Sequence, residues 1–232
     1  MSDLERLRGL IVSVQAAKES ALSPSAVITA LACAAEDGGA VAVRIESADN
    51  VRAVKAKVGV PVIGLIKRSY IGFEPYITPT LAEVEELLAA GADIVAFDAT
   101  LRERPQKTEM YKIVERITVA GALAMADCST EADALSAQRL GVPILATTLC
   151  GYTKETAGAR LPAIDLVRAL RRFGEFVVCE GGVGDPADVR AAADAGADAI
   201  VVGTAITNIA AVTSRFAASL QMRTRTDATA VK

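Results

Sequence analysis

Polar side chains that could do chemistry stand where short apolar runs of the sequence end. Seven of the eight runs are closed or followed by such a group, and the eighth ends at a glycine; the positions are Gln15, Arg44, Lys67, Asp98, Asp127, Thr147–Thr148, Glu180 and Gly203. If the runs are parallel strands of one barrel, these groups meet at its C-terminal rim, where active sites lie. The alternative is that strand ends simply become polar as they reach the surface.

Lys67 closes the otherwise apolar run PVIGLIK, residues 61–67. A free lysine has a pKa of about 10.4, so only about one amine in a thousand is neutral at pH 7. Burial and the charge of Arg44 would lower this pKa, whereas Asp127 and Glu180 would oppose them. A pKa lowered toward neutrality would make Lys67 a base or a nucleophile. Otherwise it is a surface lysine that extends its ammonium to water.

The chain lacks histidine, which excludes Ser-His-Asp and Cys-His catalysis and the commonest zinc ligand sets. The four cysteines form no C-x-x-C pair, and we expect them to be reduced, buried thiols without a catalytic role. Chemistry must therefore use Lys, Arg, Asp, Glu, hydroxyls and backbone amides. We expect no metal site.

Two glycine-containing segments follow the last two apolar runs. They read Glu180-Gly181-Gly182-Val183-Gly184 and Val202-Gly203-Thr204-Ala205-Ile206. Glycine lets backbone N–H groups approach an anion, and loops after strands 7 and 8 of a barrel often bind phosphate. The sequence therefore predicts a phosphate site at the amides of Gly181, Gly182, Gly203 and Thr204. The alternative is that these glycines only form tight turns.

Apolar runs and helical stretches alternate along the whole chain. The runs span residues 10–14, 40–45, 61–67, 93–98, 122–127, 143–148, 176–180 and 199–203, and helical stretches such as 81–90, 131–140 and 186–195 separate them. Eight strand–helix units predict a single (β/α)8 TIM barrel over residues 1–222, followed by a polar, disordered tail over 223–232. A doubly wound open sheet is the alternative.

The composition limits the class of partner. Of 232 residues, 52% are hydrophobic, and 25 basic against 28 acidic residues give a net charge of −3. This balance argues against nucleic acid and anionic membranes as partners. No apolar run is long enough to span a bilayer, and no signal peptide is visible, so we expect a cytoplasmic protein.

Eight segments together resemble the N-acetylmannosamine-6-phosphate 2-epimerase family, in order, from residue 9 to residue 216. They are GLIVSVQA (9–16), AVAVRIES (40–47), PVIGLIKRSY (61–70), ITPT (77–80), VAFDATLRERP (95–105), MADCST (125–130), ATTLCGYT (146–153) and VVGTAIT (201–207). The resemblance implies an isomerase of sialic-acid degradation that interconverts N-acetylmannosamine 6-phosphate and N-acetylglucosamine 6-phosphate. It also implies a homodimer without a redox cofactor.

The resemblance implies a role for each matching residue. Lys67 would be the base at C2, and Glu180 would move the proton during ring opening and closing. The sugar and its N-acetyl group would be bound and oriented by Gln15, Arg44 and Asp127. We also expect Thr148 and Tyr152 to bind the substrate, with Tyr152 covering the sugar. The phosphate would be held by the amides of the two glycine segments.

Two positions depart from the family pattern. Gly182 stands where E-G-R-I would place an arginine, and Asn208 stands where A-I-T-R-P would place another. Either Arg102, Arg104 or Arg215 supplies the positive charge that arginines at positions 182 and 208 would bring, or the preferred substrate differs. Two other functions remain open: a phosphate-binding lyase or synthase with Lys67 as Schiff-base nucleophile, and a regulator that binds a phosphosugar without converting it.

Overall fold

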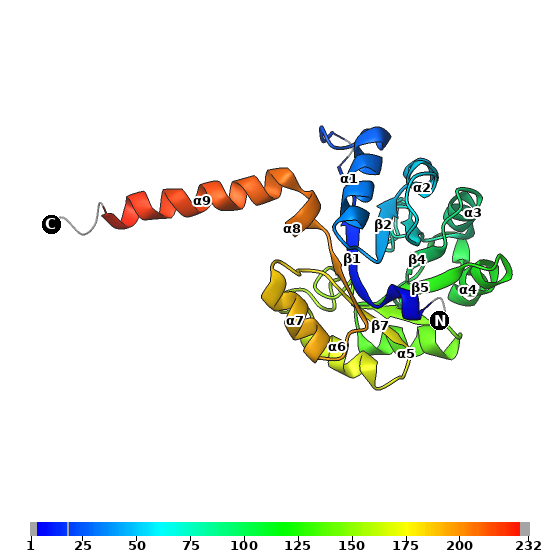
Figure 1. The fold of residues 1–232 in the computed structure, drawn as a ribbon. Helices are drawn as coiled ribbons and strands as arrows, with labels where there is room; N and C mark the ends of the chain where they lie inside the picture. The colour runs from blue at the N-terminus through cyan, green and yellow to red at the C-terminus, as the bar shows by residue number, and fades with distance from the viewer. Residues whose placement is uncertain (1–3, 18, 228–232) are drawn as a thin grey trace.

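The protein forms a closed barrel of eight parallel strands in sequence order, within residues 4–17 and 19–227, which the computed structural model describes. The ring closes because β1 pairs with both β2 and β8 (Figure 1). The strands are β1 (Gly9–Val14), β2 (Ala42–Glu46), β3 (Val62–Leu65), β4 (Ile94–Asp98), β5 (Leu123–Asp127), β6 (Ile144–Ala146), β7 (Phe176–Glu180) and β8 (Ala199–Val202). The predicted TIM barrel is confirmed, and the open sheet is excluded.

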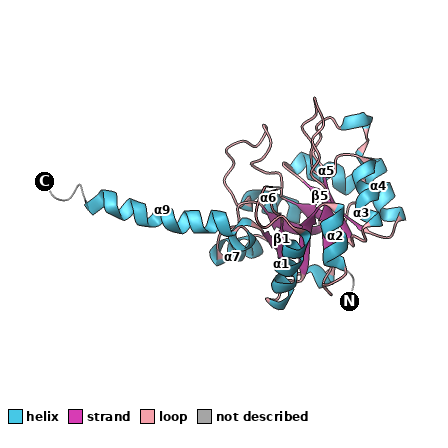
Figure 2. Ribbon diagram, turned by 90° about the horizontal axis from the view of Figure 1, so that it is seen from above, coloured by secondary structure: helices cyan, strands magenta, loops and turns pink. Residues whose placement is uncertain are grey.

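Helices cover the outside of the barrel between successive strands (Figure 2). They are α1 (Ser25–Asp37), α2 (Ala48–Lys55), α3 (Leu81–Ala89), α4 (Met110–Val119), α5 (Glu131–Arg139), α6 (Ile164–Arg171) and α7 (Pro186–Asp194), with 3₁₀ turns η1 (Glu5–Leu7) and η2 (Pro105–Lys107). Thr80 and Thr130 begin α3 and α5 with capping boxes that pair with Glu83 and Asp133. Local sequence therefore determines where these helices start.

Apolar side chains fill two layers. The inner layer, inside the barrel, includes Ala42, Met125 and Val178, and the outer layer joins the strands to the surrounding helices. Side chains alternate between the two faces of a strand, so Arg44, Asp127 and Glu180, two residues further along β2, β5 and β7, also point into the barrel. This alternation places three charged groups above the inner apolar layer.

The chain leaves the barrel after β8. A short helix, α8 (Thr204–Thr207), leads into α9 (Ile209–Asp227), which projects away from the barrel in both ribbon views (Figures 1 and 2). The apolar side chains of Ile209, Phe216 and Leu220 on α9 are 57%, 67% and 68% exposed. No helix within the described residues is long and apolar enough to cross a membrane.

The C-terminal tail differs from the expectation in one respect. Residues 223–227, predicted to be disordered, continue α9 as helix, because they contain no glycine or proline that would end it. Residues 228–232 lie outside the described residues. The domain boundary at residue 222 stays a prediction.

Candidate active site

Arg44 lies between two carboxylates at the C-terminal end of the barrel. Its guanidinium donates to both oxygens of Asp127, at 3.1 Å and 2.6 Å, and lies 3.2 Å from Oε2 of Glu180. The Thr148 hydroxyl lies 2.7 Å from Asp127 Oδ1 and 3.1 Å from Glu180 Oε2, so the two carboxylates share its single proton. The structure therefore brings together four of the predicted site residues.

The charges in this cluster perturb one another. Burial alone would lower the pKa of Arg44, but Asp127 and Glu180 raise it well above its usual value, so the guanidinium stays charged. Burial raises the pKa of Glu180, and the nearby Asp127 carboxylate adds to this, while Arg44 and Thr148 oppose both. A raised pKa makes the Glu180 carboxylate a stronger base, which suits a group that accepts a proton.

Lys67 lies at the mouth of the barrel, just beyond β3. Desolvation by the surrounding protein lowers the pKa of its ammonium, and the positive charge of Arg44 lowers it further. Glu46, Glu180 and Asp127 act in the opposite direction without cancelling the shift. The side chain keeps part of its surface in solvent, so a substrate at the mouth could contact it.

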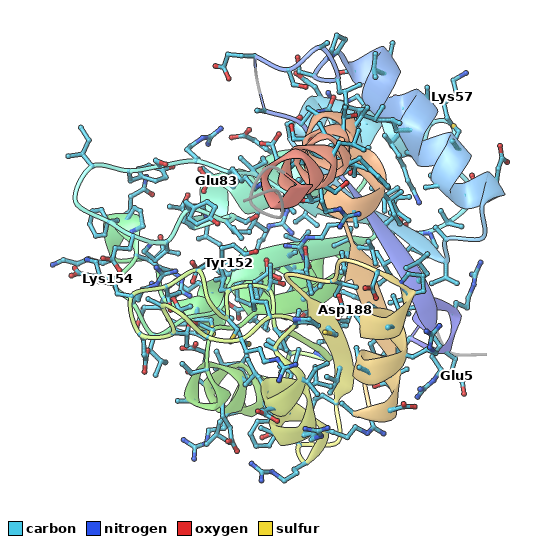
Figure 3. All side chains as sticks on the ribbon, turned by 90° about the vertical axis from the view of Figure 1, so that its left-hand side faces the viewer. Glu5, Lys57, Glu83, Tyr152, Lys154 and Asp188 are labelled. Atoms are coloured by element: carbon cyan, nitrogen blue, oxygen red, sulfur yellow. The ribbon has the colours of Figure 1, made fainter. Side chains whose placement is uncertain are left out.

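A hairpin holds the backbone of Lys67. Lys67 forms an isolated antiparallel bridge with Ile77, and the N–H of Arg68 donates to the Tyr76 carbonyl at 2.9 Å. The hairpin is fastened to α3 through Glu83, a fully buried carboxylate labelled in Figure 3. Its Oε1 accepts from Arg68 and from the Tyr70 hydroxyl, each at 2.7 Å. The K-R-x-Y segment thus combines one exposed lysine with two anchoring side chains.

Sequence reasoning missed two residues near Lys67. Glu46 on β2 accepts from the backbone N–H of Lys67 at 3.4 Å and is the carboxylate with the largest effect on its pKa. Glu46 stands two residues after Arg44 on the same strand, so the alternation of side chains could have indicated that it lies on the same face as Arg44. Tyr76 packs against the inner layer, and burial raises the pKa of its hydroxyl, as do Asp127 and Asp98. No periodicity in the sequence indicates the hairpin that places Tyr76 there.

Gln15 lies beyond the end of β1. Its amide nitrogen donates to the Ser13 hydroxyl at 2.8 Å, and its carbonyl oxygen Oε1 is buried without a partner in the described part of the chain. Ser13 also faces Gly203, where an added Cβ would lie 3.3 Å from Ser13 Cβ. Gln15 and the second glycine segment are therefore neighbours, and the free carbonyl can accept an N–H.

The first glycine segment turns sharply after β7. Gly181 and Gly182 have φ of +104° and +72°, a region that glycine adopts without strain. A Cβ on Gly181 would lie 3.5 Å from the Tyr152 ring, whereas one on Gly182 would overlap Leu161 Cβ at 2.4 Å. Tyr152 therefore lies beside this segment, with 57% of its surface exposed.

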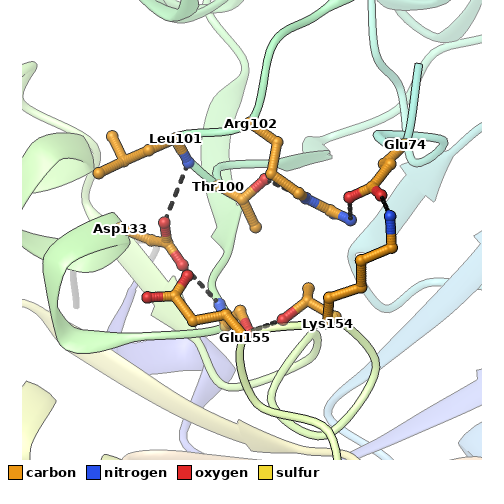
Figure 4. Close-up of a pocket in the computed structure, with 9 residues that line it drawn as sticks. Glu74, Thr100, Leu101, Arg102, Asp133, Lys154 and Glu155 are labelled. Atoms are coloured by element: carbon orange, nitrogen blue, oxygen red, sulfur yellow. Dashed lines mark hydrogen bonds and ion pairs between the residues drawn. The ribbon is translucent and has the colours of Figure 1, made fainter. Parts of the chain in front are cut away.

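Asp98 organises the loop after β4. It accepts from the N–H and hydroxyl of Thr100 and pairs with Arg102 at 2.7 Å, while Arg104 donates to the Asp98 carbonyl. Burial raises the pKa of the Asp98 carboxyl. A cavity of about 310 Å³ lies along this loop, where Arg102 and Lys154 both approach Glu74 (Figure 4). Arg102 and Arg104 are thus committed to local partners.

The cysteines do not add a reactive group to the site. Cys128, Cys150 and Cys179 are buried thiols, and burial raises the pKa of each, that of Cys179 to about 11. Protonated thiols are poor nucleophiles. Among the described residues, no group of three or more Cys, Asp or Glu side chains is arranged to hold a metal ion.

Comparisons with known proteins point to one enzyme family. Residues 28–222 match the family model described as "Putative N-acetylmannosamine-6-phosphate epimerase". The chain is 44% identical over 214 residues to the "Putative N-acetylmannosamine-6-phosphate 2-epimerase" of Yersinia pseudotuberculosis, covering 90% of this chain and 91% of the relative. A relative from Caldanaerobacter subterraneus is 40% identical over 218 residues, covering 93% and 92%.

The chain belongs to the N-acetylmannosamine-6-phosphate 2-epimerase family.

A solved structure of a family member supports this assignment. The N-acetylmannosamine-6-phosphate 2-epimerase of Clostridium perfringens superposes with a TM-score of 0.91 at 37% identity, covering 94% of this chain and 96% of that one. Thiamine phosphate pyrophosphorylase from Pyrococcus furiosus, at a TM-score of 0.60 and 16% identity over 88% and 89% of the two chains, shares the fold. The resemblance seen in the sequence is therefore confirmed at the level of the family.

Proposed function

We propose that the protein interconverts N-acetylmannosamine 6-phosphate and N-acetylglucosamine 6-phosphate by inverting C2. The observation that carries the proposal is the position of Lys67, whose pKa is lowered, at the mouth beside the buried cluster of Arg44, Asp127 and Glu180. Membership of the epimerase family supports the same activity. The reaction would belong to sialic-acid degradation.

The first step in this mechanism opens the sugar ring. A proton at C2 becomes acidic only when C1 is an aldehyde, because the resulting enediolate spreads its charge onto O1. Glu180 accepts the proton of the O1 hydroxyl as the ring C1–O5 bond breaks and passes this proton to O5, so the open-chain aldehyde is neutral and the Glu180 carboxylate is restored. The raised pKa of Glu180 makes its carboxylate a stronger base for this step.

Inversion follows at C2. The neutral amine of Lys67 removes the C2 proton, and the charged guanidinium of Arg44 stabilises the enediolate that forms. A solvent proton then reaches C2 from the opposite face, the Lys67 ammonium returns its proton to solvent, and ring closure reverses the first step. Asp127 holds Arg44 in place, Gln15 Oε1 accepts the N–H of the acetamido group, and Thr148 and Tyr152 contact the sugar.

Heavy water tests this proposal. Product formed in D2O should carry deuterium at C2, and Lys67→Met should abolish conversion while the variant still binds the sugar phosphate. Product that retains protium at C2 would contradict the enolisation route. Trapping of Lys67 by borohydride with a carbonyl substrate would favour the Schiff-base lyase or synthase instead. Ligand-dependent stabilisation of the wild type without any conversion would favour the regulator.

We further propose a cytoplasmic homodimer. The exposed apolar side chains of α9, which lies apart from the barrel, support association with a second copy. One chain has a mass of 24.0 kDa, and sedimentation equilibrium should give twice this value. Phe216→Asp should shift the protein toward the monomer, and an unchanged monomer in both proteins would contradict the proposal.

A further inference from the structure

The two positions that the family pattern gives to arginine have different surroundings in this structure. At Gly182, the first side-chain atom would overlap Leu161 Cβ at 2.4 Å, and the backbone has a φ of +72°. At Asn208, the side-chain carbonyl accepts the N–H of Ala211 at 3.0 Å and so caps the start of α9. Leu161 thus closes position 182 to a larger side chain, Asn208 serves as a helix cap, and the glycine segments lack the two expected cations.

The arginines that the sequence suggested as substitutes do not lie near these segments. Arg102 and Arg104 follow β4, which is four strands away from β8 around the closed barrel. Both are held by Asp98. Arg215 lies on α9, the helix that projects away from the barrel (Figure 1).

Arg160 is a nearer cation. It precedes Leu161, the residue that contacts Gly182 and that would also contact a Cβ on Gly151 at 3.3 Å. Its side chain is exposed and has no hydrogen bond or ion pair among the described residues. It lines a cavity of about 480 Å³ between the start of α6 and α7, together with Leu161, Arg168 and Asp188. Asp188 in turn accepts the N–H of Gly184, so the cavity adjoins the first glycine segment.

We propose that Arg160 supplies the guanidinium that binds the substrate phosphate, in place of the arginine absent at position 182. Leu161 occupies the space that an arginine side chain at position 182 would need. Arg160, the residue before Leu161 in the β6–α6 loop, brings its positive charge to the same glycine segment. A guanidinium adds charge-assisted, bidentate hydrogen bonds to those of the backbone amides. This inference rests on the proposed function, because it assumes a phosphorylated sugar.

Kinetics of Arg160→Ala test the proposal. For N-acetylmannosamine 6-phosphate, KM should rise about tenfold or more while kcat stays within about twofold, because the lost contact lies away from C2. For unphosphorylated N-acetylmannosamine, kcat/KM should not change. Arg160→Lys should recover part of the affinity, because lysine binds phosphate as a point charge.

Two matched variants serve as controls. Arg168→Ala removes a cation from the same cavity that already pairs with Asp165 at 2.9 Å, and it should leave KM unchanged. Arg215→Ala should also leave KM unchanged. A rise in KM for Arg215→Ala with none for Arg160→Ala would overturn the proposal, as would an equal loss on phosphorylated and unphosphorylated sugars in Arg160→Ala.

Calorimetry separates this proposal from the proposed function. N-acetylglucosamine 6-phosphate should bind Arg160→Ala about tenfold or more weakly than the wild type, whether or not the protein turns it over. Weakened binding without conversion by the wild type would overturn the epimerase function and support Arg160. Conversion by the wild type with unchanged affinity in Arg160→Ala would overturn the role of Arg160 alone.

Discussion

Arg44 and Asp127 form a bidentate ion pair in which 1% and 0% of the two side chains are exposed. Removing Asp127 leaves Glu180 as the carboxylate that balances the Arg44 charge and takes the acceptor from two buried N–H groups of Arg44, at about 1–3 kcal/mol of unfolding free energy. We therefore expect Asp127→Ala to lower the free energy of unfolding by about this much in urea titrations. The surface pair Arg52–Asp49, whose side chains are 58% and 88% exposed, is the control. Asp49→Ala should change stability by less than about 1 kcal/mol, and equal losses would contradict the argument.

Glu46 sets part of the pKa of Lys67. Its negative charge favours the protonated ammonium, so Glu46→Gln should lower the pKa of Lys67 further. The base must be neutral, so activity falls as pH drops through this pKa. The acid limb of kcat/KM should move to lower pH in Glu46→Gln, as pH–rate profiles of the two proteins would show. Movement to higher pH would contradict the assignment of Lys67 as the base.

Thr148 should shift the pH profile in the opposite sense. Its hydroxyl favours the ionised form of Glu180, so Thr148→Val should raise the already raised pKa of that carboxyl. Ring opening requires the carboxylate, which disappears as pH falls, so the acid limb should move to higher pH. Thr148→Ser keeps the hydroxyl and should restore the wild-type profile. The acid limbs of these profiles report macroscopic pKa values of the coupled cluster. The test therefore compares the direction in which each limb moves, and not the pKa of a single residue.

The strands and the buried charges were predictable because they depend on local pattern. The runs of Val and Ile mark strands buried on both faces, and residues 44, 127 and 180 follow from the alternation along those strands. Glu46 was equally accessible to this reasoning, although its effect on Lys67 depends on how two strands pair in space.

The loops and the last helix were not predictable in the same way. The contact between Leu161 and Gly182 joins positions 21 residues apart through loop geometry that no periodicity encodes. The course of α9 depends on where the chain turns at Asn208 after α8, and helix propensity gives no direction for a helix that leaves the barrel. The same holds for Tyr76, which a hairpin carries to the mouth.

Glu83 should matter for catalysis without touching the substrate. It fastens the hairpin of Lys67 through Arg68 and Tyr70, so Glu83→Ala should lower kcat about tenfold or more by misplacing the amine. Glu86, which pairs with Arg68 on the surface at 2.9 Å, offers the control variant Glu86→Ala. A structural role alone would lower stability without moving kcat measured well below the melting temperature.

Glu83 also links stability to pH. Burial by itself would raise the pKa of this carboxyl, but hydrogen bonds from Thr80, Tyr70 and Arg68 outweigh burial and lower it. The stabilisation is therefore complete above the unfolded pKa of about 4.3 and is lost as pH falls through the folded value. Glu83→Gln should remove this part of the acid sensitivity in melting curves recorded from pH 7 to pH 3. Unchanged acid sensitivity would contradict it.

Restoring the family arginine should fail unless Leu161 is also changed. Gly182→Arg forces a side chain into a left-handed backbone and onto Leu161 Cβ, so we expect it to lower the free energy of unfolding by about 1–3 kcal/mol. Leu161→Ala keeps the overlapping Cβ and should not relieve this loss, whereas Leu161→Gly should relieve the steric part. In Arg160→Ala, the pair Leu161→Gly and Gly182→Arg should bring KM for the sugar phosphate back toward the wild-type value. Recovery with Gly182→Arg alone would show that Leu161 does not occupy the position of the missing arginine.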